Sequence, residues 1–150
     1  MCHRVKKLTI TVLVFTILLS LNLKGQNVMN QTTDQKIKIT IGEKVLTASL
    51  NDSKTSQDFI SLLPLTLTLD DYAGTEKVSD LPKKLSVEDA PSGFDPSVGD
   101  ITYYAPWGNL AIFYKDFGYT SGLIILGRLD KGAEAFNVPD SLKVKIELNK

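Results

Sequence analysis

The sequence has almost no cysteine or histidine: it contains one residue of each among 150, and these are Cys2 and His3. The rest of the chain therefore lacks the thiols and imidazoles that zinc sites, cysteine nucleophiles and Ser-His-Asp triads require. A single cysteine also leaves no partner for a disulfide within the chain. We expect no metal and no cofactor, and a domain whose apolar core alone supplies its stability.

Charge is missing from one long segment near the N-terminus. The run from Leu8 to Leu23 has no charged residue, whereas basic residues stand on both sides of it, at Arg4, Lys6, Lys7 and Lys24. A basic start, an apolar stretch and a small residue such as Gly25 are typical of a signal peptide. We predict a signal peptide over residues 1–25 and an exported, periplasmic or secreted protein. The alternative is an uncleaved membrane anchor, although the 16-residue apolar run is shorter than the roughly 20 residues that span a bilayer.

Basic patches are also missing from the remaining chain. Removal of residues 1–25 leaves 13 basic and 17 acidic residues, a net charge of −4. Most nonspecific affinity for nucleic acids comes from attraction between basic side chains and phosphates. We therefore expect no nucleic-acid partner, and no membrane contact beyond the N-terminal signal or anchor.

The pattern of apolar residues predicts a β-rich domain. Residues 26–35 are rich in Asn, Gln and Thr and predict a flexible spacer, so the domain is expected over residues 36–150. Ile37, Ile39 and Ile41 alternate with polar residues, as in a strand with one buried face. A short helix is predicted just before Pro64. Further strand patterns occupy residues 45–50, 65–69, 101–104, 110–114, 123–129 and 144–148.

About eight short strands with one or two short helices predict an all-β fold, a closed or nearly closed antiparallel barrel without exposed edges. The sequence does not decide which residues of the strand over 45–50 face the core. Either Val45, Thr47 and Ser49 or Leu46, Ala48 and Leu50 could face the core.

One continuous stretch carries a family resemblance. Residues 99–114, GDITYYAPWGNLAIFY, resemble the signature of the small bacterial cyclophilin-like domains, and the elements around it follow that family's order. The resemblance covers roughly residues 36–149. It implies an eight-stranded cyclophilin-like barrel.

The same resemblance argues against the usual isomerase chemistry. Leu123 stands where the peptidyl-prolyl isomerases have a substrate-side histidine, Leu110 stands in the comparable position to their glutamine, and no arginine lies between Arg4 and Arg128. We therefore predict no catalytic residue, and a noncatalytic module that binds a small molecule or a peptide in the cell envelope. The alternative is a divergent peptidyl-prolyl cis-trans isomerase that uses backbone donors and an apolar groove.

Aromatic residues provide the candidate ligand site. Trp107 lies between Pro106 and Gly108, on a turn where a large ring is hard to bury, and is predicted to line the rim of a groove. Alternation sends Tyr103 and Tyr104 to opposite faces, so only about half of the nearby aromatics can line one cavity. The predicted ligand-binding residues are Tyr72, Glu76, Tyr103, Trp107, Asn109, Phe113 and Arg128.

Structural interpretations of the same residues remain open. The aromatics could be barrel core and surface stacking. Glu76 and Lys77 could be solvated charges on a loop, because exposed Glu and Lys are the norm. Arg128 could hold a carboxylate or phosphate ligand, or form a structural ion pair with an acidic residue.

Overall fold

The computed structural model describes residues 34–150. The predicted signal peptide and most of the predicted spacer lie outside the described residues. The first strand begins at Gln35, so it includes the last residue of the predicted spacer. No helix within residues 34–150 has the length and apolarity needed to cross a membrane.

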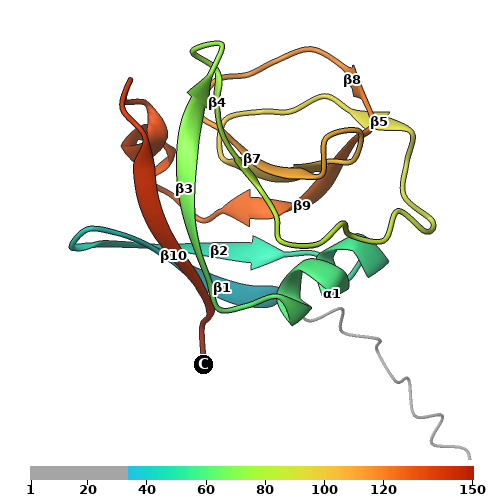
Figure 1. Ribbon diagram of the computed structural model, residues 1–150, viewed down its shortest axis with the longest axis horizontal. Coiled ribbons are helices and arrows are strands. Elements are labelled where there is room, and N and C mark those ends of the chain that lie inside the picture. The colour runs from blue at the N-terminus through green and yellow to red at the C-terminus, as the bar shows by residue number, and fades with distance from the viewer. Residues whose placement is uncertain (1–33) are drawn as a thin grey trace, which may run out of the picture. The chain divides into compact units, whose positions relative to one another are not determined.

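The strands form a closed antiparallel barrel of eight strands in the order β1-β10-β3-β4-β7-β6-β9-β2, which confirms the predicted fold class (Figure 1). A separate sheet of two strands, β5 and β8, lies beside the barrel. The helical segments are α1 and the 3-10 helix η1. The elements are β1 (Gln35–Ile41), β2 (Lys44–Leu50), α1 (Lys54–Ser61), β3 (Leu65–Tyr72), β4 (Glu76–Asp80), β5 (Gly93–Phe94), β6 (Asp100–Tyr104), β7 (Asn109–Phe113), β8 (Thr120–Ser121), β9 (Leu123–Leu129), η1 (Ala133–Phe136) and β10 (Leu142–Leu148).

The core lies inside the barrel. It consists of the side chains at every second position of the strands, which point inward. In β2 these are Leu46, Ala48 and Leu50, which decides between the two phases that the sequence left open. Both helical segments add an aromatic ring to this core, Phe59 from α1 and Phe136 from η1. The barrel strands, α1 and η1 therefore share one apolar core.

The chain between residues 50 and 65 folds as the sequence predicts. The Ser53 side chain caps the start of α1 by accepting a hydrogen bond from the backbone N–H of Ser56 at 3.1 Å. The Ser56 hydroxyl in turn donates to the carbonyl of Leu126 in β9 at 3.1 Å. These contacts fix α1 against the barrel (Figure 1).

A bulge in β9 lies next to a glycine that packs closely against β2. The pairing of β9 with β6 shifts register between Ile101 and Thr102. At the same level, a Cβ atom on Gly127 would lie 2.1 Å from the carbonyl oxygen of Ser49. Since real Cβ atoms do not approach that closely, glycine is required where β2 and β9 meet.

A second, smaller apolar cluster lies on the outside of the barrel. It contains the buried side chains Ala111, Phe113 and Leu123, against which Val78, Phe94 and Tyr104 pack. Phe94 comes from β5, so the small β5-β8 sheet adds cover to part of this outer face. The outer face of β4, β7 and β6 is therefore partly apolar, and the candidate site lies on it.

Candidate functional site

Strand register determines which side chains share the outer face of the barrel. Leu110 and Ile112 of β7 belong to the inner core, so Asn109, Ala111 and Phe113 point outward. Cross-strand pairing then aligns Tyr72 with Glu76 and Glu76 with Phe113 in one row. A second row aligns Asp80, Asn109 and Tyr104, and the short side chains Val78 and Ala111 lie between the two rows.

Trp107 joins the two rows. Its ring meets the ring of Tyr72 edge-on at 5.8 Å between centroids and 79°, and that of Tyr104 at 5.2 Å and 83°. The Trp107 side chain is nevertheless 59% exposed, and Tyr72 is 45% exposed. Edge-on aromatic contacts hold a ring in one orientation, so this side chain combines a fixed position with an accessible surface.

Glu76 adds a carboxylate beside Tyr72. Its side chain is half-buried, and among the described residues no cation or hydrogen-bond donor pairs with it. Burial raises the pKa of the Glu76 carboxyl to about 7, because removal from water disfavours the charged form. The carboxylate therefore has free capacity to bind a ligand near neutral pH.

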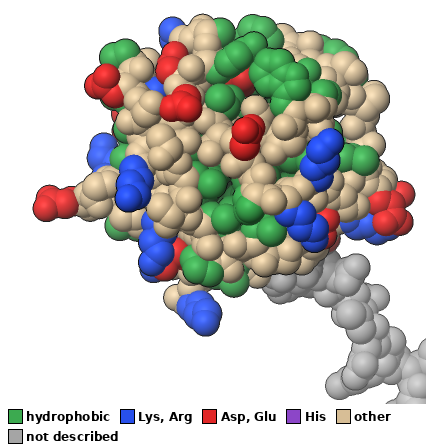
Figure 2. Space-filling view, in the orientation of Figure 1, with side chains coloured by type: hydrophobic (Ala, Val, Ile, Leu, Met, Phe, Trp, Pro, Cys, Tyr) green, Lys and Arg blue, Asp and Glu red, His purple; other side chains and the backbone are tan. Residues whose placement is uncertain are grey.

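Asn109 adds an unsatisfied acceptor. The residue is 6% exposed, and its side-chain oxygen is buried without a hydrogen-bond partner in the described structure. Buried polar atoms without partners are rare and costly. We call the set Tyr72, Glu76, Tyr104, Trp107 and Asn109 the outer-face patch. Figure 2 shows apolar side chains at the top of the molecule with acidic side chains among them.

The structure brings together some of the residues proposed from the sequence and separates others. Tyr72, Glu76, Trp107, Asn109 and Phe113 share the outer face, although Phe113 is buried in the outer apolar cluster. Tyr103 points into the barrel core, where its hydroxyl accepts a hydrogen bond from the backbone N–H of Leu85 at 3.1 Å. Tyr103 thus lies on the opposite side of the sheet from the patch.

Arg128 lies apart from the patch as well. It belongs to β9, and its guanidinium forms an ion pair at 2.7 Å with the buried carboxylate of Asp100. This is the structural ion pair that the sequence left open. Arg128 also lines a hollow of about 310 Å³ with Phe94, Ile125 and Asn51. Another hollow, of about 450 Å³, is lined by Leu63, Pro64 and charged residues of β1 and the C-terminal end.

Trp107 lines neither of these hollows. The outer-face patch is therefore an exposed surface rather than the rim of either one. Tyr104, which contacts Trp107, was missing from the residues selected from the sequence. The alternation in residues 100–104 and 109–113 could have identified it, because Tyr104 pairs with Asn109 whereas Tyr103 pairs with the core residue Leu110.

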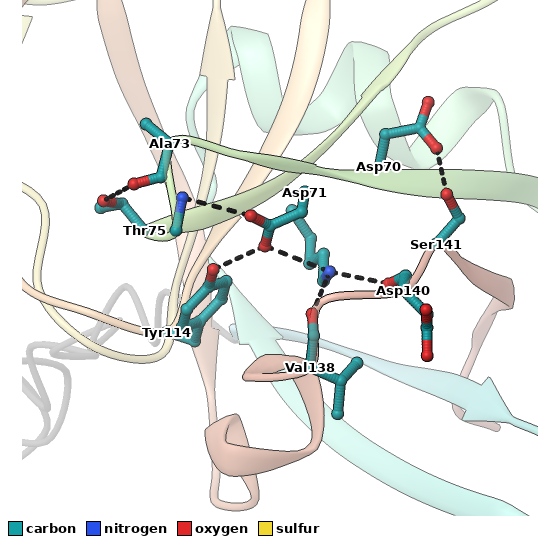
Figure 3. A network of polar contacts seen from close by, with 10 residues as sticks. Asp70, Asp71, Ala73, Thr75, Tyr114, Val138, Asp140 and Ser141 are labelled. Carbon is teal, nitrogen blue, oxygen red and sulfur yellow. Dashed lines mark hydrogen bonds and ion pairs between the residues drawn. The ribbon is translucent and has the colours of Figure 1, made fainter.

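Lys77 corrects one structural interpretation of the sequence: it is not a solvated loop residue. Its side chain is 0% exposed and points into the barrel. The ammonium donates to the carbonyls of Val138 at 2.5 Å and Asp140 at 2.8 Å, and pairs with the Asp71 carboxylate at 3.2 Å. Figure 3 shows these partners together with Tyr114, whose hydroxyl donates to Asp71 at 2.5 Å.

This network is saturated. An ammonium has three N–H donors, and each has an acceptor here. The hydrogen bond from Tyr114 is the main cause that lowers the pKa of Asp71, and the charge of Lys77 adds to it. Burial, followed by the bond to Asp71, raises the pKa of the Tyr114 hydroxyl to about 12. With every group engaged, the network fixes the segment after η1 to β4 and leaves nothing for a ligand.

No metal centre is evident within residues 34–150, because no three side chains of His, Cys, Asp or Glu gather there. The candidate site therefore consists of aromatic faces, one amide and one carboxylate. Such a set can bind a ligand by stacking and hydrogen bonding.

Comparisons with known proteins find a solved structure with a similar fold and a family model that matches the chain. No curated protein matches the chain significantly. A solved structure that is similar is the solution structure of the hypothetical protein AF2241 from Archaeoglobus fulgidus, with a TM-score of 0.59 and 16% identity over 81% of this chain and 99% of that chain. At this identity the likeness concerns the fold alone. The family model described as "Cyclophilin-like family" matches residues 39–147, most of the chain. The chain belongs to the cyclophilin-like family.

Proposed function

We propose that the protein is an exported, noncatalytic binding module that holds a small molecule or a peptide of the cell envelope on its outer-face patch. The observation that carries this proposal is the fixed but exposed Trp107, held edge-on by Tyr72 and Tyr104. Rigid aromatic side chains with accessible surface are enriched at recognition sites, because they bury much area at low cost in conformational entropy.

A noncatalytic role is supported by the residues at the positions where isomerases have polar groups. Leu123 is buried in the outer apolar cluster and Leu110 in the barrel core. The guanidinium of Arg128 is already paired with Asp100. Catalysis of prolyl isomerisation would need donors aimed at the prolyl amide. Neither leucine supplies one, and the guanidinium of Arg128 is held by Asp100.

Trp107 is the single tryptophan of the chain, so its fluorescence reports directly on the patch. We expect at least one peptide or metabolite in a panel of envelope components to change this fluorescence and to raise the melting temperature of the purified protein. A panel in which neither quantity changes would overturn the binding role.

The isomerase alternative has its own assay. A model peptide with a proline switch, followed in the presence of micromolar protein, should isomerise at its uncatalysed rate. A clear acceleration would replace the binding module with an enzyme.

Export is supported by the basic and apolar pattern of residues 1–25. Mass spectrometry of the protein purified from its native cells should give a chain that begins at Gln26. A chain that retains its first 25 residues in the membrane fraction would identify an anchor instead.

A further inference from the structure

Trp107 forms an exposed aromatic knob on the outer face of the barrel. More than half of its side chain is exposed, yet the rings of Tyr72 and Tyr104 hold it edge-on. The turn that carries it is fixed as well, because Pro106 packs so closely on Gly122 that a Cβ atom there would lie 2.7 Å from the proline Cδ. Tryptophans are enriched among the residues that dominate protein interfaces. The knob is therefore suited to insertion into a complementary hollow.

The charged groups around the knob are mainly acidic. Asp70 lies on the same face of β3 as Tyr72, and Asp80 lies on that face of β4; both side chains are exposed. Within residues 34–150, neither carboxylate forms an ion pair. Lys84 is a cation beside the knob, because its chain packs against the same turn. With the half-buried Glu76, the acids outnumber this lysine, so a basic partner surface is favoured.

The hollow of about 450 Å³ offers a surface of the complementary kind. Leu63, Pro64 and Leu148 supply its apolar walls, and it is large enough to admit an indole ring. Lys38 from β1 and Glu147 from β10 also line it, and they lie directly opposite each other in the strand register. The end of β10, β1 and the end of α1 come together in this part of the molecule, at the bottom of the view (Figure 1).

Ammonium groups outnumber carboxylates beside this hollow. Glu147 forms its ion pair at 2.9 Å with Lys145, whereas Lys38 acts on Glu147 only through its charge. Lys38 thus has a cation available for a partner. A cation attracts the face of an indole ring, and the apolar walls suit the edges of that ring. We call this site the basic hollow, and it matches the knob in polarity and in charge.

The knob and the basic hollow do not meet within one chain. Trp107 does not line the hollow. The β6–β7 pair that carries the knob and the β1–β10 pair that carries Lys38 and Glu147 lie opposite each other in the closed strand order. Two different surfaces of one molecule that complement each other produce head-to-tail contacts between copies.

We propose that copies of this chain associate head to tail, with Trp107 of one copy inserted into the basic hollow of the next and the acids beside the knob facing Lys38. The partner is thus a second copy of the chain, which goes beyond the proposed function. The contact covers the outer-face patch, so association and ligand binding compete for one surface. Repeated contacts of this kind build a ring or a filament.

Sedimentation velocity of the purified protein measures this association. We expect the average sedimentation coefficient to rise as the protein concentration increases from micromolar to submillimolar at low salt. The rise should be smaller at high salt, because salt screens the attraction between the acids and Lys38. A protein that stays monomeric over this whole range would overturn the inference.

Variants assign the contact to its two sides. Trp107→Ala removes the knob and Lys38→Glu reverses the charge of the basic hollow. Each should weaken association at least about tenfold, as for the loss of an interface hot spot. The matched control is Lys143→Glu, an exposed residue of β10 that does not line the hollow, and it should change association by less than about twofold. Equal weakening by the control, or unchanged association of either contact variant, would contradict the proposed contact.

A mixture of the two contact variants should restore one contact. Lys38→Glu keeps the knob and Trp107→Ala keeps the basic hollow, so together they should form a dimer that cannot grow further. Because Trp107 is the single tryptophan, the emission of Lys38→Glu should change when the tryptophan-free variant is added. A mixture that stays monomeric would refute the head-to-tail geometry. If Lys38→Glu folds poorly, Lys38→Ala removes the cation without placing an acid opposite Glu147.

This inference and the proposed function fail separately. The ligand panel is read at a protein concentration at which the chain is monomeric, so that a change in Trp107 fluorescence reports a ligand. A monomer that binds a member of the panel would overturn only the association. Association of a protein that is silent toward the whole panel would overturn only the proposed function.

Discussion

Glu76 and Lys77 are neighbours in β4, yet they occupy opposite faces of the barrel and differ in every physical respect. Lys77 points inward, is fully buried and has an acceptor for each of its donors. Glu76 points outward, is half-buried and has no partner in the described structure. One step along a strand thus separates a charge that holds the fold together from a charge that is free to bind.

The difference follows from the two environments. A closed barrel excludes water, so a charge inside it must be matched by protein groups or the fold is lost. The outer face keeps some contact with water, and an incompletely matched carboxylate is tolerated there at the cost of a raised pKa. Unmatched polar groups on the outside are therefore better indicators of a ligand site than matched groups on the inside.

Replacement of the inner charge should have the largest effect. Lys77→Met keeps the length of the side chain but leaves two carbonyls and the Asp71 carboxylate without their donor. We expect the free energy of unfolding to fall by about 3–5 kcal/mol, as for other broken buried ion pairs, in a urea titration. The matched control is Lys145→Met on β10, because Lys145 is exposed and its ion pair with Glu147 lies at the surface. A change there should stay below about 1 kcal/mol, and equal losses in the two variants would refute the contrast.

Neutralisation of the outer charge, at Glu76, should increase the free energy of unfolding rather than decrease it. The pKa of Glu76 rises from 4.5 to about 7 on folding, so between these values the folded protein keeps a proton that the unfolded chain releases. Stability contributed by this group therefore falls as pH rises from 4.5 to about 7. Glu76→Gln should match the parent at pH 4 and exceed it at pH 8 by roughly 1–3 kcal/mol, allowing for partial exposure of the carboxyl.

Urea titrations of both proteins across this range measure the difference directly. The comparison with the parent isolates Glu76, because Asp71, Asp130 and Glu147 have lowered pKa values and act in the opposite direction in both proteins. A Glu76→Gln variant that is less stable than the parent at pH 8 would mean that the carboxylate has a partner after all.

Removal of one hydrogen bond from the network around Lys77, with all its charges kept, should lower the free energy of unfolding by less than Lys77→Met does. Tyr114→Phe deletes the hydroxyl that donates to Asp71 at 2.5 Å and leaves the ion pair with Lys77 in place. We expect a loss of about 1 kcal/mol in the free energy of unfolding. The variant should also raise the pKa of Asp71, which can be followed by NMR titration of its side-chain carboxyl. An unchanged Asp71 titration would show that the hydroxyl is not its main partner.

Local patterns were sufficient to predict most of the fold. Alternation identified β1, β3 and β10, dense runs of strand-forming residues identified β6 and β7, and Pro64 correctly ended the region of α1. The inward phase of β2 could not be chosen, because Val45, Thr47 and Ser49 are as compatible with a strand face as their neighbours are. That choice depends on which residues meet Gly127 and Leu129 of β9, far away in the sequence.

The candidate site was only partly predictable for the same reason. Of the residues proposed from the sequence, Tyr72, Glu76, Trp107, Asn109 and Phe113 share one face in the structure, whereas Tyr103 faces the core and its neighbour Tyr104, which was not proposed, lies on that face. The burial of Lys77 was missed because its partners Val138 and Asp140 lie more than 60 positions away. No local pattern contains the closure of a barrel, which is what places these carbonyls beside the ammonium.

Truncation of the exposed ring should affect stability least. Trp107→Ala removes two edge-on aromatic contacts, but the side chain is 59% exposed and lies outside the barrel core. We expect the free energy of unfolding to change by less than about 1 kcal/mol, whereas truncation of the buried ring in Phe59→Ala should cost about 3–5 kcal/mol. Circular dichroism during urea unfolding measures both, because tryptophan fluorescence is lost in the first variant. A large decrease in the free energy of unfolding of Trp107→Ala would mean that the ring stabilises the fold. Its exposure would then no longer argue for a ligand site on the outer face.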